Sequence, residues 1–140
     1  MSNSEIKVAE LARLTDVEPH VIRYYTRIGL LTPTRNIENG YKVYSQQDAM
    51  KVRFTRKAQS LGYSLKEIEM ILGHAHQGHS PCPMVREMIV SRLEETQKKI
   101  NELEELQARM KKAVKKWDDT PNRVPDSESI CHLIEGFIDE

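Results

Sequence analysis

Apolar side chains recur at helical spacing through the first half of the chain, and turn-forming residues interrupt them at short intervals. The first apolar stripe lies at Val8, Leu11, Ala12 and Leu14. It predicts a short helix that Ser4 or a neighbouring residue caps. The second stripe, at Val21, Ile22 and Tyr25, predicts a helix that starts near Pro19 and ends at Gly29. Two short helices joined by a tight turn form a helix-turn-helix.

The segment after the second predicted helix carries a hairpin signal. Asn39 and Gly40 lie between extended, β-prone residues, and an Asn-Gly pair in that setting is a strong predictor of a hairpin. If they serve only for packing, Tyr41 and Tyr44, which follow the pair, would be half-buried aromatic residues of this hairpin. A helix-turn-helix followed by a hairpin wing predicts a winged helix-turn-helix domain.

Two serine-led motifs predict the next two helices. Ser45 precedes Asp48 by three residues, and Ser64 precedes Glu67 in the same way, so each pair has the spacing of a capping box. We therefore expect the winged helix-turn-helix domain to occupy residues 1–72. Residues 73–83 are rich in Gly, His, Ser and Pro, which break the helical pattern and predict a hinge loop.

Residues 84–117 contain no Gly or Pro and follow a heptad repeat. The a positions are Leu93, Ile100, Gln107 and Val114, and the d positions are Ile89, Thr96, Leu103, Met110 and Trp117. Seven of these nine residues are apolar, which predicts a coiled coil for dimerisation. The remaining chain is too short to cover a helix of about 50 Å, so we expect a partner helix, and a parallel or an antiparallel dimer satisfies the seam equally. Residues 118–140 are expected to form a loop and a short apolar helix over 130–137.

Composition narrows the classes of protein to which the chain can belong. Of its 140 residues, 39% are hydrophobic and 30% are charged, which is typical of long exposed helices and not of a packed α/β enzyme. We find no apolar run long enough to span a membrane and no signal-peptide pattern, so we expect a cytoplasmic protein with no membrane partner. Two cysteines are too few for a disulfide scaffold. The expected fold class is mainly α.

The net charge of zero hides an uneven distribution. Residues 20–60 carry eight Lys and Arg residues against two acidic residues, whereas residues 118–140 carry one Arg against seven acidic residues. This asymmetry predicts a basic part that faces nucleic acid and an acidic remainder. Two ordinary solvated faces would give the same counts, so charge alone leaves both interpretations open.

Helix-turn-helix, wing and basic residues together predict a unit that binds double-stranded DNA. The N-terminal end of the second helix would enter the major groove and present His20 and Arg23 to the bases. The apolar spacing favours Tyr25 as a core residue and Tyr24 as an exposed one. We interpret Lys42 on the hairpin as a phosphate contact in preference to a solvated charge.

Four strings in the first half of the chain, VIRYY, GLLTP, NGYKVY and AQSLGYSL, together resemble the MerR family of transcriptional regulators. The resemblance is dense over residues 5–72, and the heptads continue it to Trp117. Lys42 stands where Arg is commoner in the family, and it keeps the charge. The resemblance implies a homodimer in which winged helix-turn-helix domains are joined by an antiparallel coiled coil.

The same resemblance implies a function. Members of this family bind bacterial promoters whose two recognition elements are over-spaced, and they bend and untwist that DNA when an effector binds, so that RNA polymerase engages. The DNA-contacting positions of the family fall here on Arg23, Tyr24, Arg35, Tyr41, Lys42 and Arg56.

A metal effector is implied by the resemblance to the metal-responsive members of the family. Those members take one cysteine from the start of the dimerisation helix of one protomer and two from the C-terminal loop of the other. Cys82 aligns with the first and Cys131 with the last, while the middle cysteine has no counterpart. The candidate replacement donors are His79 first, and then His74, His76, His132 and Asp119. Such a set suits Zn²⁺ or another borderline divalent ion.

Other interpretations of these residues stay open. Cys131 is also explained as a small buried hydrophobe, and the hinge histidines as solvated side chains. A thiol-based sensor of electrophiles or oxidants would use Cys82 without metal. A receptor for drugs would need a larger C-terminal domain than residues 118–140 provide. No nucleophile-elbow, metalloprotease or phosphate-loop motif supports an enzyme.

Overall fold

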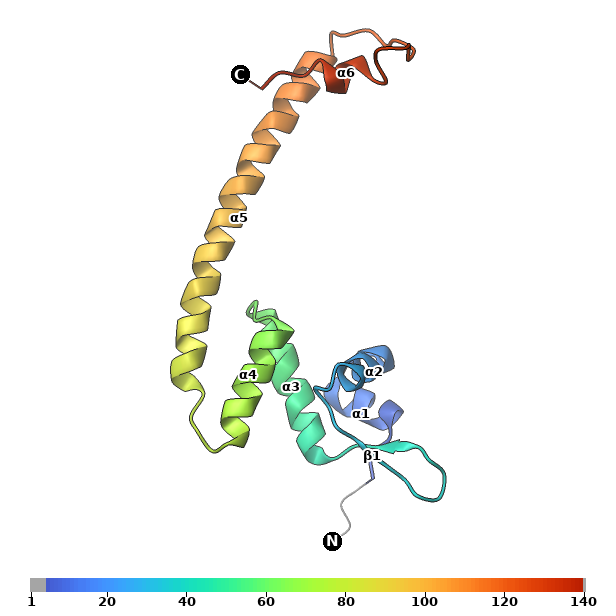
Figure 1. The fold of residues 1–140 in the computed structure, drawn as a ribbon, viewed down its shortest axis with the longest axis vertical. Helices are drawn as coiled ribbons and strands as arrows, with labels where there is room; N and C mark the ends of the chain where they lie inside the picture. The colour runs from blue at the N-terminus through green and yellow to red at the C-terminus, as the bar shows by residue number, and fades with distance from the viewer. Residues whose placement is uncertain (1–4, 140) are drawn as a thin grey trace. The chain divides into compact units, whose positions relative to one another are not determined.

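The computed structural model describes residues 5–139 and confirms the mainly α fold (Figure 1). The chain divides into two compact units, of which the first ends at Arg92 and the second begins at Leu93. The elements, in order, are α1 (Val8–Thr15), α2 (Pro19–Arg27), β1 (Thr34–Arg35), β2 (Lys42–Val43), α3 (Gln46–Ser60), α4 (Leu65–His76), α5 (Cys82–Trp117) and α6 (His132–Glu135). Within the described residues, no helix is long and apolar enough to cross a membrane.

The predicted helix-turn-helix is formed by α1 and α2. Asp16 ends α1 in the left-handed conformation (φ 55°), which a short Asp side chain tolerates, and Pro19 opens α2 in its first turn. The N-cap position of α1 is Lys7, which makes no side-chain capping bond, and the predicted Ser4 lies outside the described residues. Leu14, expected on the buried stripe, is 45% exposed because α1 ends one residue later and buries only its middle turn.

A wing follows the two helices, as predicted, and consists of β1, β2 and the loop between them. The strands are antiparallel, with Thr34 opposite Val43 and Arg35 opposite Lys42. An isolated bridge between Ile6 and Tyr44 attaches the beginning of the chain to the same sheet. The turn is wider than the Asn-Gly pair, since the N–H of Gly40 donates to the carbonyl of Asn36 at 2.8 Å.

Tyr41 and Tyr44 do not share the half-buried environment that we expected of them. Tyr44 is 2% exposed and its hydroxyl lies 2.7 Å from that of Thr26, whereas Tyr41 is 61% exposed. Side chains alternate between the faces of an extended strand, so two residues at an odd spacing point to opposite sides. Neither ring is half-buried, so the interpretation of both as half-buried packing residues was wrong.

Both predicted capping boxes are present at the starts of α3 and α4. Ser45 pairs with Asp48, and Ser64 pairs with Glu67, each through reciprocal side-chain and backbone hydrogen bonds. The hinge predicted over residues 73–83 is shorter at both ends, because α4 continues to His76 and α5 already begins at Cys82. A glycine inside a helix costs only about 1 kcal/mol relative to alanine, so Gly73 does not end α4.

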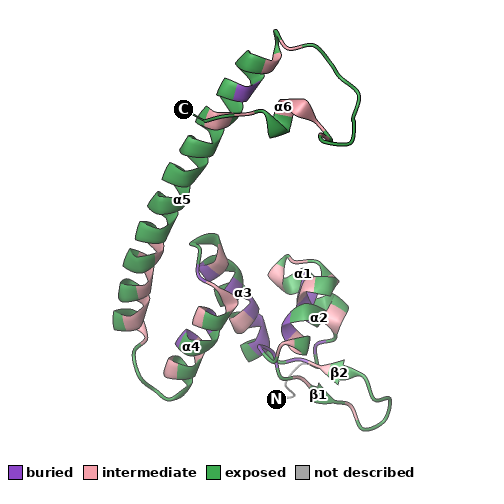
Figure 2. Ribbon diagram, turned by 45° about the horizontal axis from the view of Figure 1, so that its top comes forward, coloured by how far each residue is buried: buried purple, intermediate pink, exposed green. Residues whose placement is uncertain are grey.

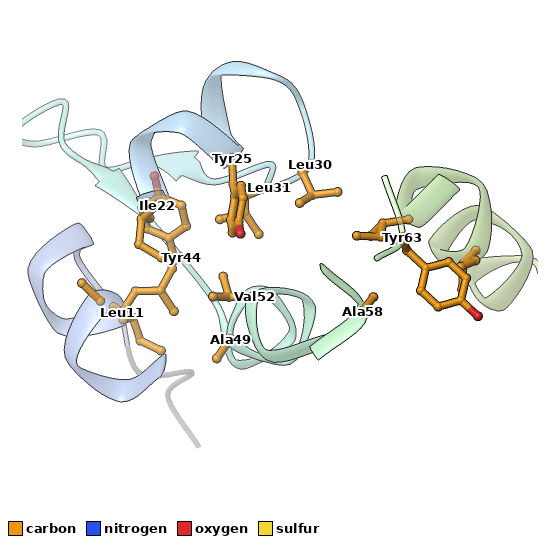
Figure 3. Packing of buried hydrophobic residues seen from close by; sticks show 14 residues of the cluster. Leu11, Ile22, Tyr25, Leu30, Leu31, Tyr44, Ala49, Val52, Ala58 and Tyr63 are labelled. Atoms are coloured by element: carbon orange, nitrogen blue, oxygen red, sulfur yellow. The ribbon is translucent and has the colours of Figure 1, made fainter. Parts of the chain in front are cut away.

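The core of the first unit is formed by side chains of α1, α2, α3 and α4 and of the segments between them (Figure 3). Ile22 and Tyr25 of α2 are 0% and 2% exposed, which confirms Tyr25 as a core residue. They pack in one cluster with Leu11 of α1 and Val52 of α3. The hydroxyl of Tyr25 donates to Gln59 Oε1 of α3 at 2.8 Å, so the ring is held at both ends.

The first turns of α5 belong to the first unit. The hydroxyl of Tyr63 donates to the carbonyl of Val85 at 2.7 Å, and the partly buried Ile89 packs on the same core. The guanidinium of Arg92 donates to Glu67 Oε1 through Nε at 2.9 Å and Nη2 at 2.6 Å. Since Glu67 also caps α4, one carboxylate joins α4 to α5. Ile89, assigned to the heptad seam, is therefore used within its own chain.

In the second unit, α5 keeps an apolar stripe at the surface. Figure 2 shows this part of the helix exposed almost throughout. The exposed seam residues are Leu93, Ile100, Leu103, Met110 and Val114, with exposed fractions between 43% and 69%. Beside the last two of these residues lies an open hollow of about 410 Å³, lined by Met110, Val114 and polar neighbours. The second unit by itself leaves this stripe uncovered.

The C-terminal segment folds back on the end of α5. Trp117 donates its indole N–H to the Leu133 carbonyl at 3.1 Å, and its ring lies edge-on to Phe137 at 6.4 Å between centroids. Asp139 accepts from Lys112 at 3.1 Å. The helix expected over residues 130–137 is shortened to α6, because residue 131 is extended and Gly136 ends it.

The ion pair at the joint of α4 and α5 makes stability depend on acid pH. The Ser64 backbone N–H, together with the Arg92 guanidinium, lowers the pKa of Glu67. The ionised carboxylate therefore stabilises the fold above the pKa that Glu67 has in the unfolded chain, and this contribution is lost as the pH falls through the lower folded pKa. We expect Glu67→Gln to lose less stability between pH 7 and about pH 3.5 than the wild type does. Denaturant unfolding at one protein concentration measures this, with Glu69→Gln at an exposed position of α4 as the control. Equal losses in all three proteins would contradict the assignment.

Candidate DNA-binding surface and thiol sites

The outer face of α2 is a continuous polar and aromatic stripe. Ile22 and Tyr25 turn the opposite face into the core. The stripe consists of His20, Arg23, Tyr24 and Arg27, which are all exposed and follow the i, i+3, i+4, i+7 spacing of one helix face. The structure thus brings together the three α2 residues predicted as DNA contacts, and the exposed position of Tyr24 (40%) is confirmed.

Arg27 is a member of this stripe that our sequence interpretation missed. Its guanidinium carbon lies 5.6 Å from the centroid of the Tyr24 ring, within cation–π range. The signal was present in the sequence, because Arg27 stands four residues after Arg23 and therefore on the same face. The stripe carries two guanidinium groups one turn apart, which is suited to neighbouring phosphates or to one phosphate and one base.

The wing forms a second basic group. Arg35 and Lys42 face each other across the two strands, and both are exposed. Arg35 also donates to the carbonyl of Gly40 at 2.9 Å, which holds its guanidinium beside the turn. The Lys7 ammonium lies 5.5 Å from the centroid of the exposed Tyr41 ring. Lys7 is a second cation that the sequence interpretation did not assign to this surface.

The last predicted DNA contact, Arg56, is exposed on α3. Its neighbour on the same helix, Arg53, donates to the carbonyl of Leu14 at 3.3 Å, near the C-terminal end of α1. Arg53 is therefore engaged in holding α1 and α3 together. Arg56 stands on a different element from the α2 stripe and the wing, so the predicted contacts come from three parts of the first unit.

Cys82 and the hinge histidines lie at the joint between α4 and α5. Cys82 is exposed as the first residue of α5, and its N–H donates to Ser80 Oγ at 3.3 Å. His74 and His79 have their rings in edge contact, 6.1 Å between centroids, while His76 is exposed at the end of α4. His74 is partly buried, so two of the predicted donors are neighbours before any ligand is considered.

Cys131 lies in a loop that one carboxylate organises. Glu135 accepts from the hydroxyl of Ser129 at 2.7 Å and from the backbone N–H groups of Ile130 at 3.0 Å and Cys131 at 3.4 Å. The Ser129 hydroxyl, followed by the Ile130 N–H, lowers the pKa of Glu135. The partly buried Cys131 is thereby held at the N-cap of α6. Glu135 stands one helical turn after Cys131, a spacing that could have revealed it.

The remaining predicted donors of the C-terminal region differ in how far they are engaged. His132 places Nε2 3.1 Å from the Pro121 carbonyl, which ties α6 to the beginning of the loop. Asp119 is exposed just after the end of α5. Within residues 5–139 of a single chain, no group of three or more His, Cys, Asp or Glu side chains is placed to hold a metal ion. Cys82 belongs to the first unit and Cys131 to the second.

Comparison with known families covers most of the chain. Residues 6–75 match the family described as MerR HTH family regulatory protein, and residues 50–113 match the family described as MerR, DNA binding. The first match contains the helix-turn-helix and the wing, and the second reaches far into α5.

Individual relatives extend the similarity to nearly the full length. The mercuric resistance operon regulatory protein of Bacillus cereus is 30% identical over 136 residues, which cover 96% of this chain and 98% of that protein. The HTH-type transcriptional regulator ZntR of Escherichia coli is 27% identical over 132 residues, covering 94% and 91%. The fold is similar to that of the transcription regulator PbrR691 from Ralstonia metallidurans in complex with lead(II). That similarity has a TM-score of 0.72 at 18% identity and covers 94% of this chain and 99% of the other.

The Glu135 loop generates a prediction about thiol reactivity. In Glu135→Ala the Ser129 hydroxyl and two N–H groups lose their acceptor, so the loop opens and Cys131 alkylates several-fold faster. Iodoacetamide labelling followed by mass spectrometry measures both cysteines in one sample, and Cys82 serves as the internal control. Glu128→Ala, at an exposed position of the same loop, is the matched variant. An unchanged Cys131 rate would show that the carboxylate does not control access to the thiol.

Proposed function

Because the chain belongs to the MerR family of transcriptional regulators, we propose that it is a homodimer that distorts promoter DNA when an effector binds between its subunits. Membership makes it a DNA-binding transcriptional regulator and not an enzyme. The observation that best supports the finer proposal is the unbroken exposed stripe on α2, which has the shape and charge of a helix that enters the major groove.

The α2 stripe and the wing contact different parts of the DNA. The N-terminal end of α2 presents His20 and Arg23 to base edges in the major groove. Phosphates on either side are bound by Tyr24, Arg27, Arg35, Tyr41, Lys42 and Arg56. Base contacts then select the sequence, while phosphate contacts fix the register and supply most of the salt-dependent affinity.

The exposed seam of α5 is the surface through which two chains would pair. An apolar stripe of this length is costly to leave in water, and a second copy of the same helix covers it with a complementary surface. An antiparallel arrangement places the winged domains at opposite ends of a stiff rod. Such a dimer holds two half-sites of a promoter at a fixed separation.

A rigid dimer that grips two half-sites can impose a shape on the DNA between them. Bending a DNA site of about 20–30 base pairs by roughly 40–90° costs of the order of 1–6 kcal/mol. Phosphate contacts from two separated domains can offset this cost. An effector that binds one shape of the dimer better than the other shifts the population between the two DNA shapes. RNA polymerase engages the realigned promoter, which places the protein in the cytoplasm of a bacterium.

We place the effector, a divalent metal ion, between the Cys82 end of one protomer and the Cys131 loop of the other. Two thiols suit Zn²⁺ or a softer borderline ion. The similarity to a mercuric resistance operon regulatory protein and to a regulator in complex with lead(II) supports this class. The third donor comes most simply from His79. His74, His76 and Asp119 are the alternative donors. His132 already has one ring nitrogen at a carbonyl, which makes it the weaker candidate. Two such ions, one at each end of the coiled coil, would link the two protomers.

DNA binding is tested with a duplex that the protein selects from a random-sequence pool. Lys42→Ala should weaken binding to every duplex and reduce the slope of log affinity against log salt by about one. Arg23→Ala should cost about 1–3 kcal/mol and relax the preference for the selected bases, because a bidentate base contact is lost. Fluorescence anisotropy over a salt series measures both effects. Lys98→Ala, at an exposed position of α5, is the control, and wild-type affinity independent of salt would overturn the proposal.

Shared ligation across the dimer predicts a complementation result. Homodimers of Cys82→Ser or of Cys131→Ser should each lose Zn²⁺, since each site lacks one thiol. A heterodimer of the two variants should keep about half of the wild-type metal, because one of its two sites has both thiols intact. Co-expression with two affinity tags, anaerobic purification, and elemental analysis measure this content. A site within one chain would leave the heterodimer empty.

The same variants separate metal sensing from a thiol sensor of electrophiles or oxidants. The exposure of Cys82 favours this second function if the metal proposal fails. Wild-type zinc content in both single variants would overturn the intersubunit site. A response of DNA affinity to peroxide that only Cys82→Ser abolishes, in protein without metal, would then establish the thiol sensor.

A further inference from the structure

The turn of the wing is rigid. The N–H of Asn36 donates to the Tyr41 carbonyl at 2.9 Å, and the N–H of Gly40 donates back to Asn36 at 2.8 Å. Two side-chain acceptors close the turn further, since Asn36 Oδ1 takes the Glu38 N–H at 2.8 Å and Asn39 Oδ1 takes the Tyr41 N–H at 3.0 Å. Gly40 adopts φ 74°, a left-handed conformation that glycine takes without strain. These hydrogen bonds hold the backbone of the loop in one conformation.

The loop carries a fully exposed apolar side chain. Ile37 is 101% exposed, more than any other large hydrophobic residue among those described. A β-branched side chain also has few rotamers, so little entropy is lost when it is held against a surface. Within its own chain Ile37 contributes nothing to the core, and the hydrogen bonds of the turn would form with any residue at this position.

The two cations on the strands of the wing indicate the surface that Ile37 meets, while the adjacent Glu38 is acidic and exposed. Arg35 and Lys42 stand opposite each other at the base of the wing, so a cation lies on each strand behind the tip. In B-DNA one row of phosphates lines each side of the minor groove. This groove is about 6 Å wide, which is too narrow for a helix but admits a single side chain. Two cations on the flanking phosphates would point an apolar tip between them, towards the floor of the groove.

We propose that Ile37 is a specificity-determining residue that enters the minor groove beside each half-site and packs against deoxyribose and the edges of A·T pairs. The inference rests on the proposed function, since it assumes that the wing lies on DNA. A·T pairs leave the floor of the groove free, whereas a G·C pair places the guanine N2 amino group there. An apolar side chain offers this amino group no acceptor and removes it from water. The wing therefore selects against G·C where it touches the duplex, while α2 selects bases in the major groove.

The test uses the selected duplex and variants of it at the flanking positions under the wing. An A·T to G·C exchange there should weaken wild-type binding, and replacing that guanine by inosine should restore it. Inosine lacks only the N2 amino group and keeps the major-groove edge. Ile37→Ala should bind the parent duplex about tenfold more weakly with an unchanged salt slope, and should not distinguish guanine from inosine.

Two further variants make the outcome decisive. Val124→Ala changes a comparably exposed β-branched residue of the second unit and should behave as wild type. Arg23→Ala should lose affinity and yet keep the distinction between guanine and inosine, because it acts in the other groove. If Ile37→Ala has wild-type affinity and wild-type discrimination, the inference is wrong while the proposed function stands. If the wild-type protein selects no duplex at all, the proposed function fails and the inference fails with it.

Discussion

The burial of Ile22 and Tyr25 on one face of α2 determines how the rest of the first unit can act. A helix has one rotation that buries both side chains, and Tyr25 fixes that rotation through its hydrogen bond to Gln59 on α3. The opposite face must then carry Arg23 and its neighbours into solvent. The wing is attached to the same core, because the hydroxyl of the buried Tyr44 is hydrogen-bonded to the hydroxyl of Thr26 on α2 at 2.7 Å. The same apolar cluster thus fixes the positions of the exposed charged residues on α2 and of those on the wing relative to each other.

The joint between α4 and α5 connects this core to the first turns of the long helix. Tyr63 and Glu67 reach the first turns of α5 through a backbone carbonyl and through Arg92, so the winged domain and the beginning of α5 form one packed body. In the proposed mechanism a change at the end of α5 must pass through this joint to move the DNA-binding surface. Cys82 occupies the joint itself, which places an exposed thiol at the point where α4 and α5 meet.

The described part of the second unit is held together mainly by hydrogen bonds and contains little buried apolar surface. Glu135 gathers a hydroxyl and backbone N–H groups around Cys131, and Trp117 anchors the returning chain on α5. Ala113 is the buried hydrophobic residue that the described part of this unit contributes to the interior. A region with so little buried apolar surface gains much of its stability from what covers it. In the proposed dimer, the exposed seam, the loop and the thiol are parts of one assembly of two chains.

Local interactions are the part of this protein that its sequence determines alone. The capping boxes of α3 and α4, Pro19, the presence of the hairpin and the outward position of Tyr24 depend on residues within about one helical turn of each other, and all were predictable. The heptads and the family strings also lie along the chain, so the long helix and the regulator family followed from them. Tertiary structure alone decided the burial of Tyr44, the use of Ile89 by its own domain, and the tie between Arg92 and Glu67. Each of these joins elements far apart in sequence, and no local pattern specifies which partners the packed chain will bring together.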